Sequence, residues 1–134
     1  MKSLFDIGIM EDEIQELLYE CPNLKNISDQ EVNEKIVLLQ YIGCKDIHIR
    51  NIIISNPYYL ECSIEKVSKL LNGMLQLGFK TLYLLLDENP RILNLDLIDI
   101  HQYINNQIKQ GISLMDIIYN LEDNPLLFDN ILDY

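Results

Sequence analysis

The sequence lacks several residue types and patterns that mark common classes of protein. Among its 134 residues there is no tryptophan and no alanine, and there are only two histidines and three cysteines. Cys21, Cys44 and Cys62 lie 23 and 18 residues apart, a spacing that matches neither a disulfide framework nor a paired metal-binding knuckle. We therefore expect three reduced, mostly buried thiols.

Motifs of catalysis are missing as well. His48 and His101 are 53 residues apart, and neither has a cysteine or histidine at metal-ligand spacing. The chain has no phosphate-binding loop, no dinucleotide fingerprint and no nucleophile elbow. We therefore predict no catalytic residue, no cofactor, no metal site and no small-molecule substrate, and we do not expect an enzyme.

Long apolar runs are absent. The longest, Leu82 to Leu86, is far shorter than the roughly 20 residues that span a bilayer, and the first residues lead into acids instead of a signal-peptide core. We expect a cytoplasmic protein with no membrane contact. With 49% hydrophobic residues, the chain can bury a core without a disulfide or metal, and its length predicts a single domain over residues 1–134.

Basic side chains are scarce. The 10 Lys and Arg face 21 Asp and Glu, and the net charge of -11 opposes strong sequence-independent binding to nucleic acid or to an anionic membrane. The shortage of basic side chains differs along the sequence. Residues 1–34 hold 2 bases and 9 acids, and residues 92–134 hold 1 base and 7 acids, whereas residues 35–91 hold 7 bases and 5 acids. Two acidic ends therefore flank a faintly basic middle.

Proline and glycine reveal an internal repeat. Successive prolines are 35, 33 and 35 residues apart, and four of the five glycines are 35, 35 and 33 residues apart. These repeated residues are Pro22, Pro57, Pro90 and Pro125, with Gly8, Gly43, Gly78 and Gly111. Because both residue types punctuate secondary structure, a fixed period in their positions indicates a repeat architecture. Gly73 is outside this phase, so either two helices cross closely there or the glycine is simply tolerated.

Each period predicts a long helix and a short helix. Ser28, Ser63 and Asp96 lie 15 residues before a glycine, as expected for the N-cap and the left-handed end of a four-turn helix. The apolar stripe between cap and glycine comprises Val32, Ile36 and Leu39; Val67, Leu71, Met74 and Leu75; and Ile100, Ile104 and Ile108. A short helix then runs from Asp46 or Ser113 to the asparagine before the next proline.

The predicted fold class is therefore all-α. We expect a helical-repeat solenoid of about three and a half two-helix units, with a period of 33–35 residues. A pair of helices this short cannot bury its own apolar face, whereas a stack of neighbouring pairs forms a continuous core.

The run from Ile42 to Leu60 resembles a unit of the mitochondrial transcription termination factor (mTERF) family. It reads glycine, a short helix with paired isoleucines, then Asn-Pro and leucine. The same likeness recurs after Gly78 and after Gly111 and covers nearly the whole chain. The resemblance implies a curved all-helical solenoid that binds double-stranded DNA or structured RNA along a basic groove. It also implies a role in transcription regulation, with no catalytic residue and no cofactor.

The sequence thus predicts a non-catalytic binding module for a macromolecular partner. The acidic charge slightly favours a protein partner, and the alternative is nucleic-acid binding in the manner of the mTERF family. The candidate contacts are the central basic residues Lys45, Arg50, Lys66, Lys69, Lys80 and Arg91. The polar faces of the long helices would form much of one surface, through Lys66, Lys69, Gln76, Gln102, Asn105, Asn106 and Lys109. The sequence predicts no particular oligomeric state.

Overall fold

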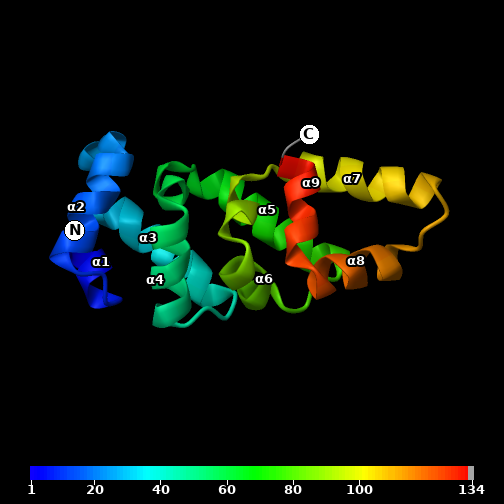
Figure 1. Cartoon of the computed structure of the whole chain (residues 1–134), viewed down its shortest axis with the longest axis horizontal. Coiled ribbons are helices and arrows are strands. Elements are labelled where there is room, and N and C mark those ends of the chain that lie inside the picture. The colour runs from blue at the N-terminus through cyan, green and yellow to red at the C-terminus, as the bar shows by residue number, and fades with distance from the viewer. Residues whose placement is uncertain (133–134) are drawn as a thin grey trace. The chain divides into compact units, whose positions relative to one another are not determined.

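The computed structural model describes residues 1–132, and helices make up most of that range (Figure 1). The three long helices are α3 (Asp29–Tyr41), α5 (Ile64–Leu77) and α7 (Leu97–Lys109). The shorter helices are α1 (Lys2–Asp6), α2 (Glu11–Glu20), α4 (Asp46–Ser55), α6 (Leu82–Glu88), α8 (Leu114–Asp123) and α9 (Asp129–Leu132). No strand occurs in the described range, and the predicted all-α helical-repeat fold is confirmed. None of these helices has the length and apolarity needed to cross a membrane.

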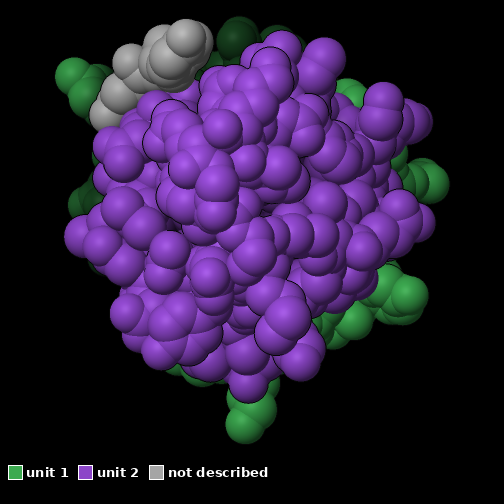
Figure 2. Space-filling model, turned by 90° about the vertical axis from the view of Figure 1, so that its right-hand side faces the viewer, with its two compact units in different colours: residues 1–64 green, residues 65–134 purple. Residues whose placement is uncertain are grey.

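The chain divides into two compact units, residues 1–64 and 65–134, coloured separately in Figure 2. Unit 1 contains α1 to α4, and unit 2 contains α5 from Glu65 onward together with α6 to α9. In unit 2 the buried rings of Phe79 and Phe128 pack with their centroids 6.1 Å apart. In unit 1 Tyr59 is fully buried. The expectation of a single domain stays a prediction.

Each proline begins a 3-10 helix. These helices are η1 (Pro22–Asn26), η2 (Pro57–Glu61), η3 (Pro90–Asn94) and η4 (Pro125–Phe128). The fixed φ of proline suits the first position of a helix, where its missing N–H costs no hydrogen bond. The residue before each proline ends the preceding α-helix, as the restricted geometry of that position requires. The predicted proline breaks are therefore confirmed.

The four in-phase glycines all have left-handed backbone conformations. Gly8, Gly43, Gly78 and Gly111 have φ angles of 93°, 103°, 112° and 93°, which glycine adopts without the steric cost of a Cβ. Three of them lie just beyond the ends of α3, α5 and α7. The predicted glycine terminations are confirmed.

The predicted helix starts also agree with the structure. Ser28 Oγ accepts a hydrogen bond from Glu31 N at 3.1 Å, and Ser113 Oγ accepts one from Asp116 N at 3.2 Å. Each bond satisfies one of the amides that a helix start leaves without an intrahelical partner. Asp96 occupies the N-cap of α7, while α4 begins at Asp46 with Lys45 at its N-cap.

The apolar stripe is buried except at two positions. Eight of the ten predicted residues are 3% exposed or less, but Leu75 is 43% exposed and Ile108 is 47% exposed. The prediction was wrong for these two. Leu75 is rotated by about 100° around α5 from its buried neighbour Met74. Ile108 lies in the last turn of α7, beyond the last buried residue of that helix, Ile104.

Gly73 marks a close approach inside unit 2. A Cβ at this position would lie 2.5 Å from both Cδ atoms of Leu97, the first residue of α7. Of the two explanations for this out-of-phase glycine, the structure supports a close crossing of α5 with the start of α7.

Candidate nucleic-acid interface

The six predicted contact residues come from different elements of the two units. Unit 1 supplies Lys45 at the N-cap of α4 and Arg50 within α4, and unit 2 supplies Lys66 and Lys69 on α5, Lys80 before α6 and Arg91 in η3. Lys45, Lys69 and Lys80 are exposed. The side chains of the other three make polar contacts within their own unit.

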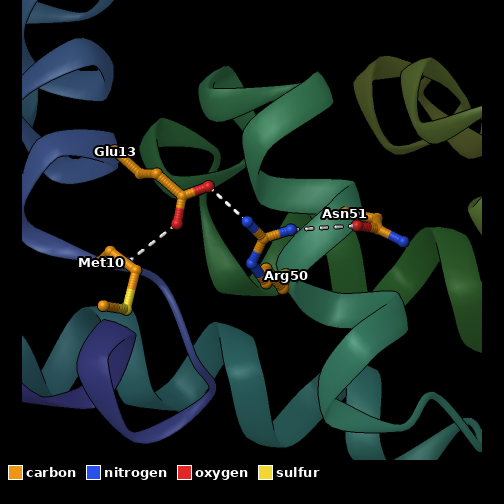
Figure 3. A network of polar contacts seen from close by, with 4 residues as sticks. All are labelled: Met10, Glu13, Arg50 and Asn51. Carbon is orange, nitrogen blue, oxygen red and sulfur yellow. Dashed lines mark hydrogen bonds and ion pairs between the residues drawn. The ribbon is translucent and has the colours of Figure 1, made fainter.

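Arg50 forms an ion pair with Glu13 of α2 (Figure 3). Its Nη2 donates to Glu13 Oε2, and its Nη1 lies 3.4 Å from Asn51 Oδ1. The other oxygen of Glu13 accepts from Met10 N at 2.9 Å, at the start of α2. Figure 3 shows the guanidinium group between Glu13 and Asn51. The charge of Arg50 is therefore balanced by a carboxylate within unit 1.

Two cations of unit 2 also lie beside carboxylates of the same unit. Lys66 Nζ donates to Asn94 O at 3.1 Å and lies 3.7 Å from Asp96 Oδ1. Arg91 Nη1 lies 3.6 Å from Asp129 Oδ1, on α9. Lys66 thus links α5 to the end of η3, and Arg91 links η3 to α9.

Lys80 belongs to a turn whose backbone is fixed. Lys80 N and Thr81 N donate to Glu122 Oε2 at 3.3 Å and 3.2 Å, and Thr81 Oγ1 donates to the same oxygen at 2.6 Å. Glu122 of α8 therefore holds the entry to α6. The backbone of Lys80 is held by Glu122, while its side chain is exposed to solvent.

Lys35 is one of the seven central bases counted from the sequence, yet it cannot contact a ligand. The residue is only 5% exposed, and its Nζ donates to Leu60 O. Tyr59 Oη in turn donates to Lys35 O at 2.8 Å. Burial lowers the pKa of Lys35, since removal from water disfavours the charged form.

The exposed faces of α5 and α7 carry few carboxylates. No acid occurs between Lys66 and Leu86 or between Ile100 and Met115. The exposed polar residues there are lysines and amides, namely Lys69, Asn72, Gln76, Gln102, Asn105, Asn106 and Lys109. These two faces of unit 2 are therefore less repulsive to phosphate than the net charge of the chain suggests.

A cavity of about 440 Å³ lies along α7 beside α9. Its lining residues are Asp99, Gln102, Tyr103, Asn105, Asn106 and Lys109 of α7, with Asn130 and Ile131 of α9. Sequence reasoning placed Gln102, Asn105 and Asn106 on a polar face but missed the cavity. No periodicity in the sequence indicates that α9 contacts α7.

Metal ligands and cysteine thiols are the other side chains that could carry chemistry. Among residues 1–132, no group of three or more His, Cys, Asp or Glu could hold a metal ion. Cys21 and Cys44 are buried free thiols, and Cys62 is a half-buried one. Burial raises the pKa of Cys21, which keeps this thiol protonated and weakly reactive.

Comparison with known proteins identifies the family. The model of the mTERF family matches residues 1–127. No curated protein and no solved structure gives a significant match. The matched range contains all four repeated prolines and all four left-handed glycines, the residues that shape every repeat. The chain therefore belongs to the mTERF family.

Proposed function

We propose that this protein binds nucleic acid and has no catalytic role. Membership of the mTERF family carries the proposal, because this is a family of helical repeats that bind nucleic acid. The same observation favours the nucleic-acid alternative over the protein partner that the acidic charge favoured.

Lys45, Lys69 and Lys80 are the residues best suited to contact phosphates. All three are exposed. Arg50 and Lys66 are half-buried and paired within their own unit, and Arg91, although exposed, lies 3.6 Å from Asp129. Lys69 and Lys80 also belong to the stretch between Lys66 and Leu86 that contains no acid. Three phosphate contacts give a logarithmic salt slope of about -2 to -3. The proposed binding is thus weak, and it depends on salt less steeply than the binding of a protein that makes about six to ten phosphate contacts.

The test is a pair of charge reversals in unit 2, with a matched control in unit 1. Lys69→Glu combined with Lys80→Glu should weaken binding of a fluorescent oligonucleotide at least about tenfold, because it replaces two attractions with two repulsions. Lys2→Glu combined with Lys25→Glu, at exposed positions of α1 and η1 in the acidic first segment, makes the same change in net charge and should change affinity much less. Equal losses in the double variant and the control would show that only net charge matters and would contradict the assignment.

A protein partner is the second candidate, and the net charge of -11 favours it. Recovery of one stoichiometric partner from the native host, by a tagged chain that binds no oligonucleotide, would support this function instead. Salt-sensitive oligonucleotide binding with no enriched protein would contradict it.

A further inference from the structure

We infer that the cavity along α7 and α9 binds an unpaired nucleobase, so that the preferred ligand is single-stranded. This inference rests on the proposed function and specifies the ligand of one surface of unit 2. The cavity volume of about 440 Å³ falls within the roughly 300–1,000 Å³ typical of small-ligand sites. A single base with its sugar is a ligand of that class.

Four of the eight residues that line the cavity are amides. Gln102, Asn105 and Asn106 come from α7, and Asn130 comes from α9. Each amide offers a donor and an acceptor side by side, which is the pattern that the edge of a nucleobase presents. Four such groups around one cavity favour a planar ligand with alternating donors and acceptors.

The charges at the cavity balance. Among the described residues that line it, Asp99 is the one carboxylate, and Asp99 Oδ2 accepts a hydrogen bond from Asp96 N at 3.2 Å, at the start of α7. Lys109 is the one cation of the lining and lies in the last turn of α7. A neutral base is therefore favoured inside the cavity, while Lys109 can contact the phosphate of the same nucleotide.

An aromatic ring completes the site. Tyr103 lines the cavity and is half-buried, so part of its ring is held by the protein and part is open to a ligand. Gln102, Asn106 and Lys109 follow one another at i, i+4 and i+7 along one face of α7, and Tyr103 comes directly after Gln102. Stacking of a base on an aromatic ring contributes about 1–3 kcal/mol and tolerates different bases.

The α9 wall of the cavity is fixed in place. Asn89 Nδ2 donates to Asp129 Oδ1 at 3.1 Å and to Pro125 O at 3.0 Å, and Arg91 Nη1 lies 3.6 Å from the same Asp129 oxygen. Phe128, directly before α9, is fully buried. These contacts attach the start of α9 to the end of α6 and to η3 before any ligand binds, which reduces the ordering cost of binding.

The cavity chemistry favours a single strand over a duplex. In a duplex the pairing edges of the bases are already engaged, whereas unpaired bases can be stacked and hydrogen-bonded by side chains. Duplex binding also depends strongly on many phosphate contacts, and residues 65–134 hold 5 bases and 10 acids. Recognition through the base therefore compensates for the few available cations.

The test compares two double variants on two ligands. Gln102→Ala with Asn106→Ala removes two amides of the cavity, and Asn33→Ala with Gln40→Ala removes two exposed amides of α3 in unit 1, outside the candidate interface. The ligands are a single-stranded oligonucleotide of about twelve nucleotides and an abasic strand of equal length. The cavity variant should bind the base-bearing strand about tenfold more weakly and the abasic strand unchanged. The α3 variant should match the wild type on both.

Two other results separate this inference from the proposed function. If the wild type binds both strands equally, with the expected salt dependence, the nucleobase site is overturned and nucleic-acid binding stands. If no oligonucleotide binds, titration with free adenosine, monitored by the side-chain amide NMR signals of Gln102 and Asn106, decides the matter. Shifts confined to the cavity amides would support the nucleobase site without nucleic-acid binding. Unchanged signals would overturn the nucleobase site. All four substituted side chains are exposed, so far-UV circular dichroism should confirm that both variants fold.

Discussion

Lys35 is a buried cation, and its titration makes the stability of the protein depend on pH. Burial lowers its pKa below the ordinary 10.5, and the attraction of Glu31 opposes this shift less strongly. Between the lowered pKa and 10.5, the unfolded chain holds this proton more often than the folded protein does. Stability contributed by Lys35 therefore rises with pH across that window.

Replacement of Lys35 by methionine should remove this dependence. Urea unfolding of wild type and Lys35→Met across the window gives the difference in free energy of unfolding at each pH. We expect the wild type to gain stability relative to the variant as the pH rises, because only the wild type carries the group that titrates. A difference that stays constant with pH would contradict the buried-charge description of Lys35.

Gly73 gives a second prediction, tested with a double-mutant cycle. In a helix interior, alanine is normally more stable than glycine by about 1 kcal/mol, but here the new Cβ would meet Leu97 at 2.5 Å. Gly73→Ala should therefore stabilise the protein when Leu97 is already alanine, and should lose that gain, or destabilise the protein, in the wild-type background. Equal effects in the two backgrounds, measured by urea unfolding, would exclude the close contact.

At the scale of elements, the asparagine before a proline has a role that differs from one repeat to another. Asn89 is 4% exposed and donates to the backbone of η4 and to α9. Asn124 occupies the equivalent repeat position but is exposed. Asn89→Leu should cost about 1–3 kcal/mol, because the buried Pro125 O of η4 and the partly buried Asp129 of α9 lose their donor. Asn124→Leu should stay within about 0.5 kcal/mol of the wild type. Thermal unfolding of the two variants checks the contrast, and similar costs would refute it.

The elements also show which parts of the structure can be predicted from sequence. The proline turns and left-handed glycines are predictable because their constraints act within one residue of the backbone. The pairing of Arg50 with Glu13 joins residues 37 positions apart, and no local pattern indicates it. The same is true of Arg91 with Asp129 and of the cavity beside α9. Sequence reasoning therefore predicted the helices well but could not identify which cations are already paired.

At the scale of the whole molecule, function must be reconciled with a net charge of -11. Carboxylates are concentrated at the two ends of the sequence, while Lys69 and Lys80 lie in a stretch without acids. Long-range repulsion and short-range attraction should therefore compete. Because added salt screens both and also removes the gain from counterion release, binding should be confined to low salt.

The most direct test of nucleic-acid binding is a fluorescence-anisotropy titration of the wild type at two salt concentrations. Short single strands, duplex DNA and duplex RNA are compared at about 50 mM and about 200 mM salt. We predict binding at the lower concentration, tightest for the single strand, and a loss of affinity of about twentyfold or more at the higher one. Absence of binding to all three ligands at the lower concentration would contradict the proposed function.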